Sequence, residues 1–190
     1  MRLVAALSVG LLLFGGVPSD AGAQATGRRG LVLGAGAGRG LARLACGICQ
    51  AERQGGLTGY VQAGVMAGGS VLLGLEGAGW LRDEAGVNQR IWTLTGTASV
   101  YPRAVSGLYF KGGLGMLSYR ARDDADQFRS RALSASVGMG YELRVGRSLT
   151  VAPFAALFAT ANADLDFNGS RVAGDASFTL LQLGLGLTLD

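Results

Sequence analysis

The residues best placed to carry chemistry are two cysteines in the sequence Cys46-Gly47-Ile48-Cys49. Two thiols at this spacing can form a redox pair or half of a metal site. A thioredoxin-type pair needs its first cysteine at a helix N-terminus, and a zinc site needs four ligands. The chain has no histidine and no second motif of this kind. The sequence therefore favours a disulfide that staples a loop, as an oxidising compartment permits.

Other arrangements that could carry chemistry are incomplete. The lack of histidine removes Ser-His-Asp triads and most zinc sites. Asp164, Asp166 and Asp175 could bind calcium, but such carboxylates more often form a solvated rim that bridges lipopolysaccharide through divalent ions. The glycines of residues 34–38 resemble a phosphate loop without its Lys-Ser/Thr and its helix. We expect no catalytic residue, no metal and no cofactor.

The elements that carry the polar residues show a period of two. In residues 132–145, the odd positions from Leu133 to Val145 are mainly apolar, and the even positions are small or polar. A strand places successive side chains on opposite faces, so this stretch has one greasy and one polar face. It is also long enough to cross a bilayer when tilted.

The same pattern recurs along the chain. We expect strands at residues 31–44, 57–66, 71–81, 90–101, 108–120, 132–145, 149–167 and 176–190. Long polar connections alternate with short ones, which is typical of transmembrane barrels with an even number of strands. The sequence predicts an all-β, eight-stranded, antiparallel, up-and-down transmembrane β-barrel.

The start of the chain has the composition of a signal peptide. Arg2 precedes an apolar core at residues 3–17, and cleavage is expected after Ala23 or Ala25. A genuine N-terminal membrane helix is the alternative. We expect residues 1–25 to be removed during export through the periplasm and residues 26–190 to form the barrel in the cell outer membrane.

Composition fits a barrel with a narrow lumen. The chain has 33 glycines and 3 prolines among 190 residues, which argues against long amphipathic helices and suits a crowded inner wall. The net charge of +4 comes from scattered bases without a polybasic block, so we expect no nucleic-acid partner.

Alternation alone does not say which set of residues faces inward, because a lipocalin is also an eight-stranded barrel. Abundant Gly, Ser and Thr on one face suits a narrow lumen. Aromatic girdles mark membrane interfaces, and five aromatic residues are expected toward strand ends: Trp92, Phe110, Tyr141, Phe167 and Phe178. These features favour a membrane barrel with its aliphatic face outward.

The inward positions include a set of charged residues. Turn centres place them in one layer, in the order Gln62, Glu76, Thr97, Lys111 and Glu142, with Arg144 one inward position below. In this register Lys111 lies directly across from Glu142. Buried charges must be paired, so we expect a network centred on Lys111. Separate, water-solvated lumen residues are the alternative.

These features resemble the small outer-membrane β-barrel superfamily, which includes the OmpA-, OmpX- and OmpW-like proteins. The resemblance rests on the signal, the strand pattern and the last strand. Members usually end in a polar-x-Gly-x-x-apolar-x-aromatic pattern that the barrel-insertion machinery reads. Here the pattern stands as Gln182, Gly184, Leu187 and Leu189, with leucine in the aromatic position and one residue after it.

The resemblance implies an architecture but no activity. Outer-membrane lipid A deacylases and palmitoyltransferases use a catalytic histidine that has no counterpart here. We therefore expect a non-enzymatic, monomeric barrel with an envelope-structural or loop-display role, in contact with outer-membrane lipid and lipopolysaccharide. A narrow pore or transporter for small or apolar molecules, and a soluble periplasmic lipocalin-like binder, are the alternatives.

The cysteine motif generates a first prediction. Cys46 and Cys49 of the exported protein are joined by a disulfide, so its intact mass should rise by two hydrogens after reduction. Mass spectrometry of freshly purified protein, with and without reductant, checks this. Free thiols in the unreduced sample would contradict the prediction.

Overall fold

The computed structural model describes residues 30–45, 52–67, 69–84, 86–102, 107–122, 127–146, 148–160, 163–167 and 170–189. The strands are β1 (Leu31–Ala45), β2 (Arg53–Ala67), β3 (Val71–Glu84), β4 (Val87–Val100), β5 (Leu108–Arg122), β6 (Gln127–Tyr141), β7 (Leu143–Arg144), β8 (Leu149–Thr160), β9 (Ala163–Phe167) and β10 (Ser170–Leu189). In this part of the chain, no helix is long and apolar enough to span a membrane. The expected signal peptide and both cysteines lie outside the described residues.

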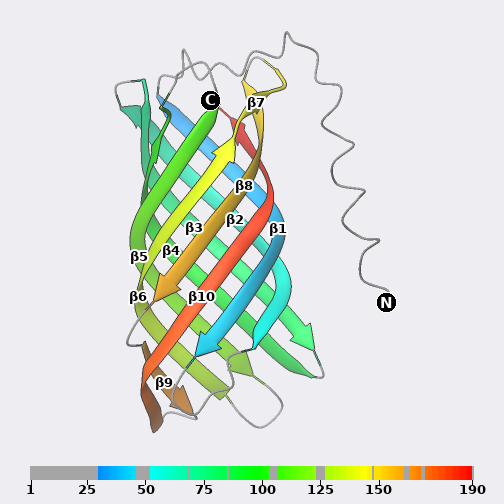
Figure 1. Cartoon of the computed structure of the whole chain (residues 1–190), viewed down its shortest axis with the longest axis vertical. Coiled ribbons are helices and arrows are strands. Elements are labelled where there is room, and N and C mark those ends of the chain that lie inside the picture. The colour runs from blue at the N-terminus through cyan, green and yellow to red at the C-terminus, as the bar shows by residue number, and fades with distance from the viewer. Residues whose placement is uncertain are drawn as a thin grey trace, which may run out of the picture.

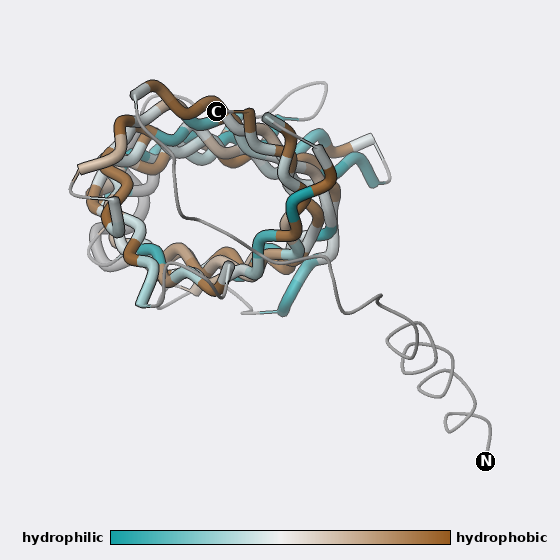
Figure 2. Tube along the Cα trace, turned by 90° about the horizontal axis from the view of Figure 1, so that it is seen from above, coloured by the Kyte–Doolittle hydropathy of each residue, from teal (hydrophilic) through white to brown (hydrophobic). Residues whose placement is uncertain are grey.

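The strands close into a ring in which each wall position pairs antiparallel with the next (Figure 1). β1 pairs with β2 on one side and with β10 on the other, which closes the barrel. β8 and β9 follow each other along one position between β6 and β10, and β7 is a short pairing beside β8. These pairings give the ring eight wall positions. Figure 2 shows the ring end-on. The predicted eight-stranded barrel is confirmed.

The ends of the barrel differ in what they carry. We call the end where β1 begins and β10 finishes the terminal end, and the opposite end, which carries β9, the distal end (Figure 1).

The expectation of a polar loop at residues 82–89 is wrong, because β3 and β4 continue through this segment until Glu84 pairs with Val87. Gly86 adopts a positive φ of 81° there, which glycine tolerates without steric cost. The expected long connection is thus a tight hairpin.

The outside of the barrel is aliphatic. Leu114 and Leu133 are 74% and 80% exposed, and they stand among many outward leucines and valines. The inward set combines small, polar and aromatic residues. This is the reverse of a lipocalin, so the period-two pattern sets the apolar face toward lipid.

Aromatic and aliphatic side chains fill the lumen in two clusters. The distal cluster surrounds Trp80, Phe158, Phe178 and Leu180, which are at most 1% exposed. The terminal cluster consists of the buried residues Val32, Leu72, Tyr101, Tyr109 and Ala152. The expectation that Phe178 joins an outward girdle is wrong, because its parity on β10 is inward, as for Leu180. Trp92, Phe110 and Tyr141 do face outward.

Glycines make room for the large lumen side chains. Trp80 fits the inner parity without a bulge, and its indole Nε1 donates to the Gly40 carbonyl at 3.1 Å. A Cβ on Gly40 or on Gly56 would lie 2.6 Å from the Trp80 ring. A Cβ on Gly36 would likewise lie 2.4 Å from the Tyr60 ring. The inner glycines therefore leave room for aromatic side chains that come from the adjacent strand or from the strand beyond it.

A glycine substitution tests this close packing. Gly184 pairs with Gly38, and a Cβ on Gly184 would lie 2.3 Å from the Ala37 carbonyl oxygen. We expect Gly184→Ala to lower the free energy of unfolding by roughly 2 kcal/mol, because the backbone must shift to relieve overpacking. Urea unfolding in detergent micelles measures this.

Gly112→Ala is the matched control, since nothing lies within 4 Å of a Cβ built there. An equal loss of stability in both variants would contradict the packing argument.

Candidate functional site

The central feature of the lumen is an ion pair between β3 and β5. The Lys111 ammonium donates a hydrogen bond to the Glu76 carboxylate. Glu76 is 1% exposed and Lys111 8% exposed, so both charges are removed from bulk water. Lys111 Nζ also lies 5.2 Å from the centroid of the Tyr60 ring, at cation–π distance. A buried pair of this kind is strongly destabilised when one partner is removed.

Lys111 reaches Glu76 along a diagonal. Glu76 pairs with Thr95 on β4, and Thr95 pairs with Gly115 on β5. Lys111 precedes Gly115 by four residues, and Gly113 is the inward residue between them. Because Gly113 and Gly115 have no side chains, the long lysine side chain can extend along the wall to the carboxylate.

The neighbours of Glu76 agree with the expected register on one side only. Gln62 pairs with Glu76 across β2 and β3, as expected. Thr97 does not lie beside Glu76 or Lys111: it pairs with Gly74 and with Gly113. The β3–β4 turn is centred one residue earlier than expected, which moves the pairing by two residues. Thr95, which is fully buried, occupies the expected place of Thr97 beside Glu76.

Glu142 lies inside the barrel but not opposite Lys111. Lys111 pairs with Gly138, because the β5–β6 connection is centred about two residues earlier than expected. The Glu142 backbone N–H instead donates to the Gly107 carbonyl at 2.9 Å. Its carboxylate Oε1 accepts a hydrogen bond from the Tyr101 hydroxyl at 2.9 Å. Among the described lumen residues, the Glu76 carboxylate thus accepts from an ammonium, and the Glu142 carboxylate accepts from a phenol.

Arg144 lies between β6 and β8, and the C-terminal pattern that the insertion machinery is expected to read lies in β10. Arg144 lies in β7, is half-buried and pairs with Thr150. Gln182 is buried, and its amide donates to the Thr58 hydroxyl. Leu187 and Leu189 face outward at the terminal end and are 52% and 55% exposed.

Sequence reasoning missed several polar lumen residues. Tyr60 and Tyr101 share the inward parity of Gln62 and Ser99, and that parity is the signal that could have identified them. Three buried hydroxyls in the described lumen, those of Thr95, Ser134 and Ser136, have no hydrogen-bond partner in the protein. Among the described residues, no group of three or more His, Cys, Asp or Glu side chains could hold a metal ion. The chemistry that the described lumen does show is the charge pairing of Glu76 with Lys111.

Three solved structures of other proteins share the fold of this chain. Neisserial surface protein A matches with a TM-score of 0.59 and 12% identity, covering 84% of this chain and 96% of that one. Ail, the attachment invasion locus protein of Yersinia pestis, matches with a TM-score of 0.51 and 11% identity, covering 85% and 100%. The outer membrane protein OprG from Pseudomonas aeruginosa matches with a TM-score of 0.50 and 11% identity, covering 86% and 98%.

These are eight-stranded outer-membrane barrels, so the fold expected from the sequence resemblance is confirmed. No protein-family model matches the chain, and no curated protein matches it.

The ion pair generates a prediction about stability. Lys111→Met leaves Glu76 buried without its cation, which should lower the free energy of unfolding by about 3 kcal/mol. Adding Glu76→Gln removes the stranded charge, so the double variant should recover most of that loss. Urea unfolding of both single variants and the double variant completes the cycle. If the two single losses simply add in the double variant, the ion pair is not coupled.

Proposed function

We propose that this chain is a non-enzymatic integral outer-membrane β-barrel with an envelope-structural or loop-display role. The observation that carries the proposal is the closed lumen. The Glu76–Lys111 ion pair lies between the distal cluster around Trp80 and the terminal cluster around Leu72. Where the structure describes it, side chains fill the lumen at both levels, and a lumen packed in this way should pass solutes poorly.

The outer surface supports membrane integration rather than a soluble binder. Leucines and valines cover the described exterior, whereas a soluble lipocalin-like barrel would hold such residues inside. The filled lumen also disfavours the narrow-pore alternative. The fold shared with three bacterial outer-membrane proteins supports an outer-membrane location.

Outer-membrane lipid, lipopolysaccharide and the barrel-insertion machinery are the partners we propose, and we propose a monomer. The last strand supports a role in assembly. Leu187 and Leu189 project outward near its end, where another protein could contact them. Gly184 has a packing role as well, because its close approach to Gly38 excludes a side chain.

Membrane fractionation and conductance test the proposed function. The exported protein should remain in the outer-membrane fraction after carbonate washing, and unboiled protein should migrate differently from boiled protein in electrophoresis. In planar bilayers it should give no stable single-channel steps, because the lumen is filled.

The double variant Trp80→Ala and Phe158→Ala is the positive control, since it removes two of the largest buried lumen side chains. Discrete conductance steps from the wild-type protein would favour the pore alternative. Release of the protein by carbonate would contradict membrane integration.

A further inference from the structure

Five outward arginines lie together at the distal end of β4, β5 and β6. We call them the arginine row: Arg90, Arg120, Arg122, Arg129 and Arg131. Arg120 pairs directly with Arg90 on one side and with Arg129 on the other. Like charges opposite each other in a sheet destabilise it. Such a row becomes favourable when an anion lies across it.

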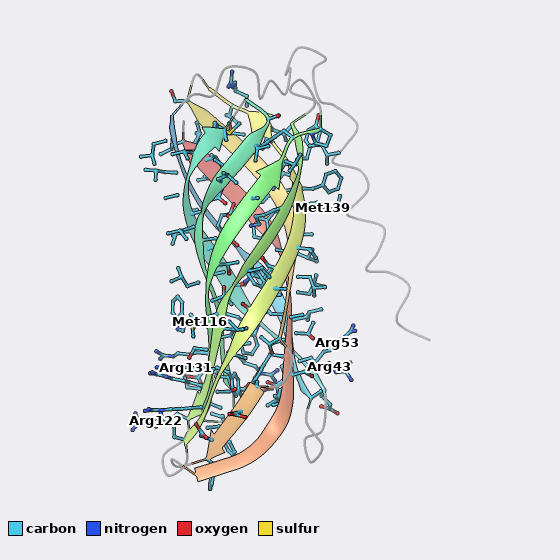
Figure 3. The ribbon with its side chains drawn as sticks, turned by 90° about the vertical axis from the view of Figure 1, so that its left-hand side faces the viewer. Arg43, Arg53, Met116, Arg122, Arg131 and Met139 are labelled. Carbon is cyan, nitrogen blue, oxygen red and sulfur yellow. The ribbon has the colours of Figure 1, made fainter. Side chains whose placement is uncertain are left out.

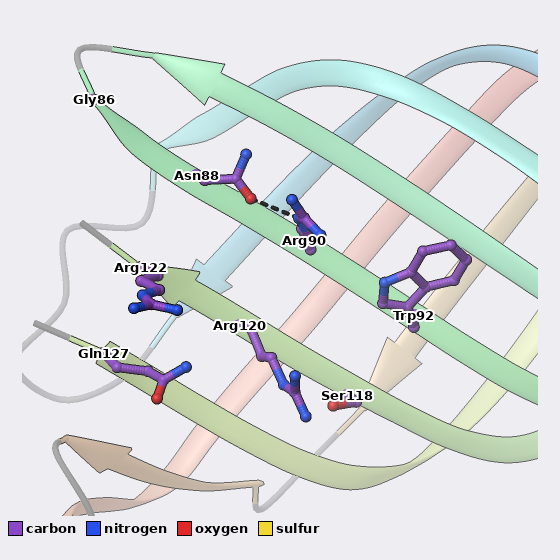
Figure 4. Close-up of a pocket in the computed structure, with 8 residues that line it drawn as sticks. All are labelled: Gly86, Asn88, Arg90, Trp92, Ser118, Arg120, Arg122 and Gln127. Carbon is purple, nitrogen blue, oxygen red and sulfur yellow. Dashed lines mark hydrogen bonds between the residues drawn. The ribbon is translucent and has the colours of Figure 1, made fainter. Parts of the chain in front are cut away.

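The two sides of the row differ in their nearby carboxylates. Arg129 and Arg131 pair across the sheet with Asp166 and Asp164 of β9. The other side borders a hollow of about 770 Å³, shown in Figure 4. Its described lining contains Arg90, Arg120 and Arg122 together with Asn88, Ser118, Gln127, Trp92 and Gly86, and it contains no carboxylate. The described lining is therefore cationic and hydrogen-bonding, with the Asp83 carboxylate one contact away, behind Asn88.

Neighbouring side chains hold Arg90 at the edge of this hollow. Its Nε donates to the Asn88 side-chain oxygen at 2.6 Å, drawn in Figure 4. The Asn88 amide nitrogen in turn donates to Asp83 at 3.3 Å. This chain of contacts engages only one guanidinium N–H of Arg90, and a guanidinium carries five.

The arginine row stands at the edge of the apolar band. On β4, Trp92 is the next outward residue after Arg90, and on β6, Leu133 is the next after Arg131. In Figure 3, Arg122 and Arg131 project outward near one end of the barrel, and Met116 lies farther along toward the middle. Arginines beside a tryptophan at the limit of a hydrophobic band lie at the level of lipid headgroups.

An apolar groove adjoins the cationic hollow. Its volume is about 490 Å³, and its floor includes the outward glycines Gly59, Gly77 and Gly79. Leu57, Val61, Leu81 and Trp92 also line it. Trp92 lines both the groove and the cationic hollow. One molecule could thus place a charged group on the arginines and an apolar chain in the groove.

We propose that this face binds one phosphorylated, acylated glycolipid of the lipid A type. Its phosphates contact Arg90, Arg120 and Arg122, and one acyl chain passes Trp92 into the groove over Gly77. Three guanidinium groups match more than one phosphate, since a phosphate monoester carries about −1.5 to −2 charges at neutral pH. This inference rests on the proposed outer-membrane location.

Native mass spectrometry of the purified full-length protein in detergent tests the headgroup site. The probe is diphosphorylated lipid A, titrated against the wild-type protein. The triple variant Arg90→Gln, Arg120→Gln and Arg122→Gln should bind it about tenfold or more weakly, because charge-assisted hydrogen bonds are lost. The single variant Arg120→Gln should show a smaller loss, and it serves if the triple variant does not fold.

Matched controls come from the same chain. Arg43 and Arg53 are outward arginines that pair with each other on β1 and β2, on the other side of the barrel in Figure 3. Arg43→Gln with Arg53→Gln should leave the affinity within about twofold of wild type. An equal loss in this pair and in the arginine-row variants would overturn the headgroup site.

The groove is tested separately. A Cβ on Gly77 meets nothing closer than 3.8 Å, so Gly77→Leu should fold and fill the groove, weakening lipid A binding about threefold to tenfold. Gly96→Leu is the control, because Gly96 also faces outward with its nearest atom at 3.8 Å and does not line the groove. Equal affinities for Gly77→Leu, Gly96→Leu and wild type would overturn the acyl-chain assignment.

Two further probes distinguish the source of the phosphate. Dephosphorylated lipid A with the same acyl chains should bind at least about tenfold more weakly than the phosphorylated form, and inorganic pyrophosphate should not compete at lipid concentrations. Competition by pyrophosphate at those concentrations, or equal binding of the dephosphorylated lipid, would overturn the proposal. Because the assay uses purified protein, its failure is distinguishable from a failed fractionation experiment.

Discussion

The rest of this structure depends on the closure of the backbone hydrogen-bond network. A bilayer offers no water to an unpaired N–H or carbonyl, so a spanning sheet needs a partner at every edge. β1 supplies the last pairing, because it bonds to β2 along one edge and to β10 along the other. Once the ring is closed at eight wall positions, the lumen is narrow, and each inward residue competes for space with residues from across the barrel.

Competition for space explains the composition of the inner wall. Trp80 and Tyr60 occupy room that Gly40, Gly56 and Gly36 leave empty. These aromatic residues form a packed core inside the barrel, whereas the apolar residues of the exterior face lipid. The buried charges then have little access to water, so the Lys111 ammonium lies against the Glu76 carboxylate and near the Tyr60 ring. The ion pair is thus a consequence of how densely the lumen is filled.

The sequence predicted the facing of residues better than their neighbours. Period two assigned Glu76, Lys111 and Glu142 to the inside, and an error of two or four residues in register leaves that assignment unchanged. The same errors wrongly placed Thr97 beside Glu76 and Glu142 directly across from Lys111, whereas the observed partners are Thr95 and Gly138. The cause of the errors was the charge at the strand ends, because residues 82–89 and 127–129 were expected to be loops. In a barrel, charged outward side chains at a strand end can lie in water or among headgroups while the backbone stays paired.

Side-chain length also decided what could be predicted. Lys111 lies four residues from the row of Glu76 along β5, yet its flexible stem reaches the carboxylate past two glycines. Glu142 is shorter, and its carboxylate accepts from the Tyr101 hydroxyl. Phe178 shows a different source of error. Its position near a strand end suggested that it belongs to an outward aromatic girdle, but its parity places it in the lumen.

In the proposed outer-membrane setting, the arginines of the distal end should also limit how deeply the barrel can sit in the bilayer. Arg122 and Arg131 project on one side and Arg43 and Arg53 on the other (Figure 3). Sinking by a few ångströms would carry guanidinium groups from the interface toward hydrocarbon, and an arginine costs about 2–4 kcal/mol at the midplane of a barrel wall. Rising would expose leucines to water. Because these penalties act on opposite sides of the barrel, they oppose tilting of the barrel axis as well as movement along the membrane normal.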